Sequence, residues 1–206
     1  MKKRLYNYFV QIRRGREIIN FLDALTGEWV NSAPEINHFQ KFKSGDFDSL
    51  VEKLHLSNFL LWNTESLIRK NDYGGDCRGL KKKIDSLNLE RNRTIEDIDS
   101  RIESLLNLPS VPLEELDKYY INSETPGQII DRLSILSLKI FFRKKKEKPD
   151  RGEIGMLEYQ RNFLVVAFDR FLDHLEKGNG FMISFRAFKQ YEDSELIPVR
   201  ESKEEI

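Results

Sequence analysis

Polar and aromatic side chains that could do chemistry recur in one leucine-rich segment, residues 54–70. At about 100° per residue in a helix they fall in a stripe about 80° wide, beside an apolar row through Leu54, Leu61 and Ile68. The members of the stripe are His55, Asn58, Trp62, Glu65 and Arg69. Burying such groups is costly unless they are paired, so the stripe indicates either a structural hydrogen-bond network or a ligand site.

Two further segments repeat this pattern. Between residues 79 and 106, Arg91 falls within an apolar arc, where a guanidinium needs an acidic partner. Between residues 126 and 146, Arg132 and Lys139 lie between two apolar arcs, so both are predicted to point into the bundle or its mouth. The polar stripe of the first of these segments is Asp85, Asn88, Asn92, Glu96 and Asp99. Three helices that turn such residues toward one interior favour a functional site.

The residue types limit the chemistry of such a site. Arg91, Arg132 and Lys139 are predicted to clamp a phosphate or carboxylate by charge-assisted hydrogen bonds. In a catalytic version, Glu65 or Glu96 is the general acid/base, and His55 carries a proton or orients the ligand. Further ligand contacts are assigned to three polar members of these stripes, Asn58, Asn92 and Asp99.

Metal-dependent chemistry is an alternative. Glu96 and Asp99, three residues apart, could share a magnesium ion with Glu65, as in helical nucleotide pyrophosphohydrolases. A zinc site is disfavoured because the three histidines lie in different predicted elements without H-x-x-x-H spacing. The motifs of P-loop, dinucleotide-binding and hydrolase-elbow proteins do not occur. No metal ligands are therefore assigned, and any cofactor stays undetermined.

The start of the segment that begins at residue 125 offers a different anion site. Thr125, Pro126 and Gln128 form the pattern of a capping box with proline at the first helical position. Free amides around Gly127 are predicted to face outward with the helix dipole behind them. Glu124 either caps these amides or pairs with an inward base such as Arg91.

The elements that must position these residues are helical almost everywhere. Apolar spacing of three and four residues predicts five main helices and no strand–helix alternation, so the expected fold is an all-α single-domain bundle. The expected helices cover residues 16–30, 46 to about 71, 79–106, 126–146 and 151 to about 177. One domain is predicted over residues 1–199, ending in an irregular C-terminal arm from residue 181, with a disordered tail over 200–206.

Composition restricts the class of protein. Lys and Arg total 34 and Asp and Glu total 34, so the net charge is zero and nucleic-acid binding is not predicted. The single cysteine, Cys77, fits a reducing compartment. No apolar run approaches the ~18 residues that span a bilayer, so a cytoplasmic protein without a transmembrane segment is expected.

Four blocks of the sequence carry a resemblance to a known family. LHLSNFLLWNTESLIRK (54–70), KKKIDSLNLERNRTIEDID (81–99), NSETPGQIIDRLSILSLKI (122–140) and SFRAFKQYEDSELIPV (184–199) resemble, in order, the blocks of the bacterial domain of unknown function 4254 family. The resemblance covers most of the residues singled out above, and it implies that Glu124 and Asp131 also contact the ligand. It departs from the family pattern at Ser66 and Arg93, where an acid is usual, and this weakens a metal site in this member.

The resemblance implies a genomic context but no established activity. Members are often encoded among glycosyltransferase and surface-polysaccharide genes. This context implies an accessory or catalytic protein of cell-surface polysaccharide synthesis that binds a phosphorylated sugar or nucleotide sugar. The alternative is a non-enzymatic helical module that binds a glycosyltransferase or other protein partner through its aromatic tail. A shorter likeness of residues 91–106 to the first helix of helical chorismate mutases leaves a further enzymatic alternative open.

Overall fold

The computed structural model describes residues 12–35, 39, 42, 45–69 and 77–183. Five long α-helices account for most of these residues, and the expected all-α class is confirmed. Their bounds are α2 Gly15–Ser32, α3 Phe47–Arg69, α4 Cys77–Leu106, α5 Pro126–Lys144 and α6 Arg151–Glu176. A short 3₁₀ helix, η2 (Leu113–Lys118), and two-residue strands β1 (Tyr120–Ile121) and β2 (Gly180–Phe181) complete the described elements.

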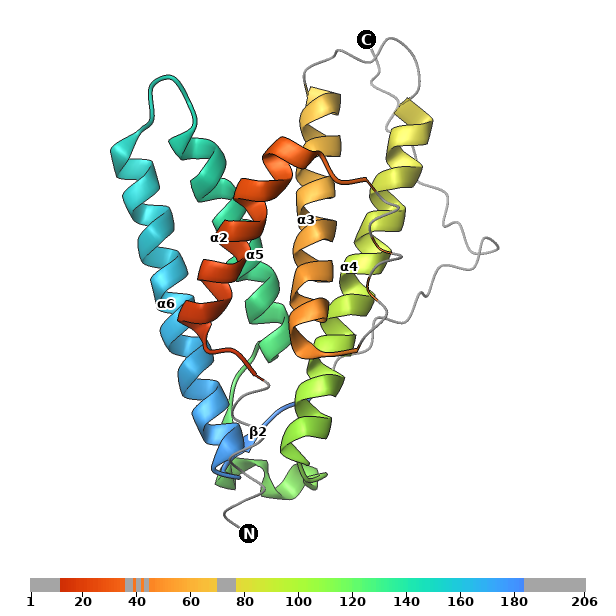
Figure 1. Ribbon diagram of the computed structural model, residues 1–206. Coiled ribbons are helices and arrows are strands. Elements are labelled where there is room, and N and C mark those ends of the chain that lie inside the picture. Colours follow the sequence, from red (N-terminus) through yellow and green to blue (C-terminus); the bar gives the residue numbers. More distant parts are fainter. Residues whose placement is uncertain (1–11, 36–38, 40–41, 43–44, 70–76, 184–206) are drawn as a thin grey trace, which may run out of the picture.

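The helices form a bundle in which α6, α5, α3 and α4 lie side by side, and α2 crosses in front of α5 (Figure 1). The closest neighbours are α3 with α4 and α5 with α6. Because α5 also contacts α2, α3 and α4, its side chains are the ones that meet side chains from every other layer.

The apolar core is divided into two clusters. The larger joins α2, α3, α4, α5 and α6 around fully buried side chains such as Ile18, Ile98 and Phe168. The smaller centres on Trp29 and Phe59, which meet edge to face at 5.6 Å. These clusters fix the orientation of α3 and α5, so the polar residues between them have little freedom to move.

Local sequence explains most helix boundaries. Asp46 accepts the Ser49 backbone N–H at 2.9 Å and starts α3, and Asp150 accepts the N–H groups of Gly152 and Glu153 to start α6. The capping box predicted at Thr125 and Gln128 is confirmed, with Pro126 in the first turn. The chain leaves α6 through Gly178, whose φ of 74° favours glycine.

The predicted helix bounds agree with the structure to within a few residues, but two features of the chain were not foreseen. The parallel pairing of Tyr120 with Gly180 joins segments 60 residues apart, which local spacing cannot reveal. Asn107, with φ of 50°, ends α4 in a left-handed conformation. The predicted end of the second helix past residue 70, the C-terminal arm beyond residue 183 and the tail over 200–206 lie outside the described residues.

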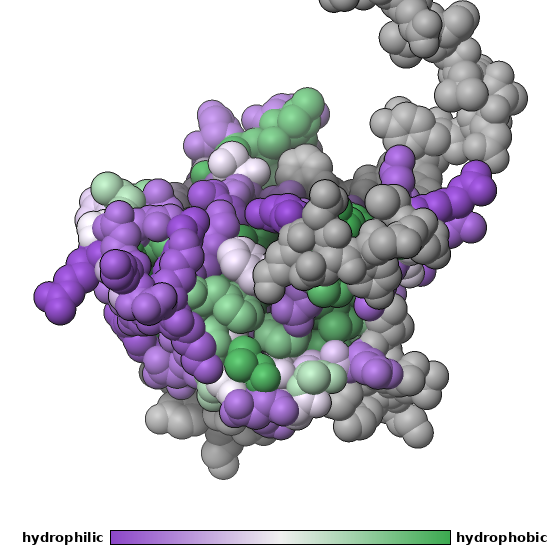
Figure 2. Space-filling model, turned by 90° about the horizontal axis from the view of Figure 1, so that it is seen from above, coloured by the Kyte–Doolittle hydropathy of each residue, from purple (hydrophilic) through white to green (hydrophobic). Residues whose placement is uncertain are grey.

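One end of the bundle is strongly polar. Figure 2 looks down on the end where α5 and α6 are joined, and hydrophilic residues gather on its left side, over that connection.

Within the described residues, no helix is both long and apolar enough to cross a bilayer.

Candidate functional site

A chain of buried hydrogen bonds runs between α3, α5 and α2 through His55. The His55 ring is fully buried, with Nε2 2.8 Å from Thr26 Oγ1 and Nδ1 2.8 Å from Ser134 Oγ. Thr26 donates its own hydroxyl proton to the Leu22 carbonyl, so Thr26 Oγ1 must accept from His55 Nε2–H. Nδ1 is then an acceptor, and Ser134 donates to it.

This pattern assigns His55 to the neutral Nε2–H form. Burial away from water lowers the pKa of His55 from 6.5 to about 3, in agreement with that assignment. The ring also stacks on Trp29 with centroids 5.2 Å apart. His55 therefore holds helices together as an uncharged group, a position that fits an orienting role better than exchange of protons with solvent.

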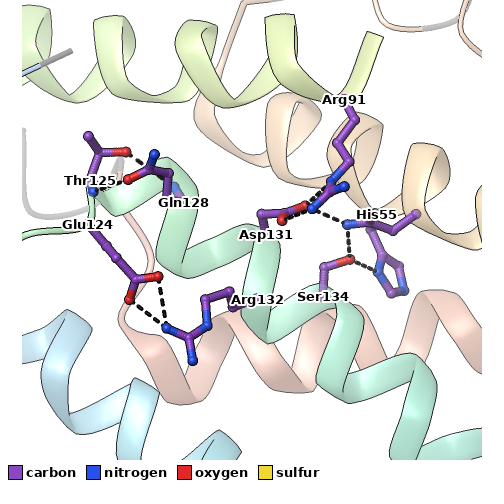
Figure 3. A network of polar contacts seen from close by, with 9 residues as sticks. His55, Arg91, Glu124, Thr125, Gln128, Asp131, Arg132 and Ser134 are labelled. Carbon is purple, nitrogen blue, oxygen red and sulfur yellow. Dashed lines mark hydrogen bonds and ion pairs between the residues drawn. The ribbon is translucent and has the colours of Figure 1, made fainter. Parts of the chain in front are cut away.

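The same network continues to an ion pair at Asp131 (Figure 3). Arg91 Nε and Nη2 donate to the two carboxylate oxygens of Asp131, the first at 2.8 Å. Asn58 Nδ2 donates both to Asp131 Oδ1, at 2.9 Å, and to Ser134 Oγ, at 3.0 Å. Asp131 is 4% exposed, and this bidentate contact raises the pKa of Arg91, although burial of the guanidinium opposes the shift.

Above this network lies an open cavity of about 280 Å³ between α3, α4 and α5. Its volume is near the lower end of small-molecule sites. Trp62 stands in its wall, held by stacking on Phe142 at 5.3 Å. The lining residues are Asn58, Leu61, Trp62, Glu65, Arg69, Asn88, Arg91, Ile135, Leu138 and Lys139.

The charges around this cavity are unbalanced toward the positive. Glu65 pairs with Arg69 at 3.0 Å, and Arg91 is matched by Asp131 from behind. Lys139 is exposed and has no ion-pair or hydrogen-bond partner within the part of the chain that the structure describes. Lys139 and Arg132 were both predicted to point into the bundle or its mouth; Lys139 lines this cavity, whereas Arg132 does not.

The predicted cation clamp does not assemble as one unit. Arg132 lies about two turns before Lys139 along α5 and makes two bonds to the carboxylate of Glu124, at 2.8 and 2.7 Å (Figure 3). It faces a separate groove against α6. Adjacent residues on a helix point about 100° apart, so Asp131 and Arg132 serve different faces of α5. Glu124 was expected to cap the amides of α5 or to pair with an inward base such as Arg91. It pairs instead with the exposed Arg132, so neither expectation holds.

The outward-facing anion seat predicted at the start of α5 was also wrong. The Gly127 N–H donates to Asp99 Oδ1 at 2.7 Å, and the Gln128 N–H donates to Thr125 Oγ1 at 3.3 Å. The chain's own carboxylate thus occupies the place proposed for a ligand. Asp99 is 2% exposed, and desolvation raises its pKa from 3.8 to about 6, against the effect of its bonds to Thr125 and Gly127.

The remaining candidates are dispersed. Glu65 lines the cavity, whereas Glu96 is half-buried and Asn92 is exposed, and neither is among the lining residues. Among the described residues no group of three His, Cys, Asp or Glu side chains is placed to hold a metal ion. The proposed magnesium set of Glu65, Glu96 and Asp99 is therefore not gathered into one site.

Sequence inspection missed two members of the network, Thr26 and Ser134. Both are fully buried hydroxyls that bond to His55 from different helices. Ser134 lies on the inward row of its helix beside Leu133, a signal that could have indicated it. Nothing local distinguishes Thr26, since its role depends on how α2 crosses the bundle.

The fold and site define an all-α bundle protein with a satisfied buried polar network beneath an electropositive cavity. The family model described as a protein of unknown function, DUF4254, matches residues 48–183, and the chain belongs to that family. The match covers three of the four resembling blocks and ends before the fourth. No curated protein and no solved structure matches the chain.

Proposed function

We propose that this protein binds a small phosphorylated molecule, with a sugar phosphate or nucleotide sugar as the ligand class, in the cavity between α3, α4 and α5. The observation that carries the proposal is Lys139, an exposed ammonium group without a partner among the described residues, at the rim of a cavity that Arg91 also lines. Two cations at one concave site attract an anion and fix its position.

The cavity wall supports the sugar and nucleotide part of the proposal. Trp62 offers an aromatic face that a sugar ring or a base can cover, and Asn58 and Asn88 supply amide groups for hydroxyl recognition. The two bonds from Arg91 to Asp131 use only part of the guanidinium's donors, so the remainder are free to contact a phosphate. The gene context that accompanies the family resemblance supports a ligand from cell-surface polysaccharide synthesis.

Catalysis at this cavity rests on one carboxylate. Glu65 is the acidic residue among those that line it, and it is the candidate general base, 3.0 Å from Arg69. A binding role requires no such group, so turnover of the bound ligand would be tested after binding is established.

The experiment is a thermal-shift titration with UDP-glucose, a hexose phosphate, inorganic phosphate and uncharged glucose. Saturation at 100 times the dissociation constant stabilises the folded state by about 2.7 kcal/mol, which raises the unfolding midpoint by roughly 5–11 °C for a chain of this size. Quenching of Trp62 fluorescence gives a second reading, and Trp62→Phe separates it from the buried Trp29.

Lys139→Ala is the diagnostic variant, and Lys144→Ala is its matched control. Both lysines are exposed on α5, but Lys144 pairs with Glu158 of α6, away from the cavity. Loss of the midpoint shift in Lys139→Ala alone supports the proposal. The proposal fails if none of the phosphorylated probes raises the midpoint, or if Lys144→Ala removes the shift equally.

A further inference from the structure

Helix α6 has two apolar faces, and only one of them lies in the core. The inward face buries Leu164, Phe168 and Phe171. The outward face exposes four large hydrophobic side chains by more than half: Met156 58%, Tyr159 68%, Phe163 65% and Val166 57%. In Figure 1 α6 forms the left-hand edge of the bundle, and Phe163 and Val166 also line the groove that Arg132 faces.

The outward residues follow the spacing of a helix-pairing surface. Starting at Gly152 and ending at Arg170, they recur at alternating steps of four and three residues, which is the a/d pattern of a coiled coil. We call this row the outer seam; its members are Gly152, Met156, Tyr159, Phe163, Val166 and Arg170. A surface with this period presents knobs that fit between the side chains of a second helix rather than a random scatter of apolar groups.

Charge is absent from the middle of the outer seam for a structural reason. The acids of α6 turn sideways onto neighbouring helices, Glu153 to Arg143, Glu158 to Lys144 and Asp173 to Arg14. The exposed residues that flank the outer seam, Gly155, Gln160 and Asn162, are small or uncharged. Charged residues make up 33% of the chain, but they are absent from the middle of the outer seam. Aromatic and methionine side chains without charged neighbours are typical of the core of a protein interface.

We propose that the outer seam binds the outer seam of a second copy of this chain, with the two α6 helices antiparallel. A two-fold axis between Tyr159 and Phe163 places Tyr159 of each copy against Phe163 of the other, and Met156 against Val166. The four hydrophobic residues of the row are symmetric about that axis, with Met156 and Val166 outside the aromatic Tyr159 and Phe163, which is what a self-complementary interface requires.

The exposed area of the four hydrophobic residues is more than half of what each copy buries in a standard interface. If each large side chain presents about 150–250 Å², the exposed fractions of the four hydrophobic residues amount to roughly 500 Å² per copy. The flanking residues extend this toward the roughly 800 Å² per partner of a standard interface. Gly155 has no atom within 4 Å of an added Cβ, so the surface beside the outer seam is open to a second backbone.

Charge selects the antiparallel orientation. Arg170 has no ion-pair partner among the described residues, and parallel helices would set it against its own copy. The antiparallel register instead places Arg170 over the start of the partner's α6, beside Asp150, an exposed carboxylate. Opposite charges at the rim fix register more than they add affinity.

The test is the mass of the full chain in solution, by light scattering during size exclusion, at micromolar protein concentration. The wild-type chain should run at twice its 24.4 kDa mass. Phe163→Asp should be monomeric with an unchanged circular-dichroism spectrum, since Phe163 is 65% exposed. The control Leu113→Asp alters a side chain that is 81% exposed outside α6 and should stay dimeric. A monomeric wild type, or a dimeric Phe163→Asp, overturns the proposal.

A pair of variants tests the register. Met156→Glu and Val166→Lys should each be monomeric, because each buries two unpaired charges in the interface. Mixing them in equal amounts should restore a dimer, since the antiparallel register sets residue 156 of one copy against residue 166 of the other. A parallel pair would bring neither charge to its counterpart, so a mixture that stays monomeric refutes the antiparallel register.

Discussion

Asp99 should make this protein less stable as pH rises, and replacing it by asparagine should remove that dependence. Its carboxyl group is buried against the first turn of α5, where desolvation raises its pKa to about 6 from a reference value of 3.8. Between pH 3.8 and about pH 6, the Asp99 carboxyl group is therefore protonated in the folded state, whereas it has already lost its proton in the unfolded state. This contribution to stability is fully present below pH 4 and is lost as pH rises through 6.

The magnitude follows from the difference in pKa. About two units at 1.4 kcal/mol each give roughly 3 kcal/mol of stability lost between pH 4 and pH 7. Asparagine has the shape of the protonated acid, and its amide oxygen can accept the Gly127 N–H. Asp99→Asn should therefore exceed the wild type in unfolding free energy by an amount that grows by about 3 kcal/mol from pH 4 to pH 7.

The assay is urea unfolding followed by circular dichroism, at several values of pH, for both chains. Asp97→Asn is the control, because Asp97 lies on the same helix with an exposed side chain, and its replacement should change the unfolding free energy by no more than about 0.5 kcal/mol. A difference between Asp99→Asn and the wild type that is flat, or that shrinks as pH rises, would refute the argument that burial controls this carboxyl group.

Three further predictions concern the buried network and its supports. Asp131→Ala should lower the unfolding free energy by about 3 kcal/mol, because it leaves the half-buried Arg91 without its acidic partner. A double-mutant cycle with Arg91→Ala should show a coupling energy above about 1 kcal/mol. Additive effects of the two substitutions would contradict the network. Gly127→Ala should lower the free energy of urea unfolding by about 2 kcal/mol or more, because a Cβ there would lie 2.6 Å from the Ile95 carbonyl oxygen. Gly27→Ala should instead raise it by about 0.5–1 kcal/mol, because the space around Gly27 in α2 is open. The ring carbon signals of His55 in NMR spectra should show no protonation between pH 7 and pH 5, since its pKa in the folded state is about 3; a titration near 6.5 would show that the ring is open to water.

Local sequence was sufficient to predict the helices of this protein. Apolar residues at three- and four-residue spacing and side chains such as Thr125 and Asp150 act over one or two turns, so the five helices and their starts follow from nearby residues alone. The same reasoning indicated that His55, Asn58 and Arg91 turn toward the interior, because a helix projection places each side chain relative to its own axis.

Tertiary structure alone decided which of the inward residues meet. Helix projection gives no information on how far one helix slides or rotates against another. It could therefore not predict that Arg91 pairs with Asp131 rather than with Glu124, or that Asp99 accepts the Gly127 N–H at the start of α5. The separation of Arg132 from Lys139 has the same origin. The two residues share a face of α5 about two turns apart, and each acquires different neighbours only once α3, α4 and α6 pack at different places along that face. Sequence thus determined the elements and their polar faces, whereas the packing of α5 among four helices decided which of those faces became a network, a cap or a cavity wall.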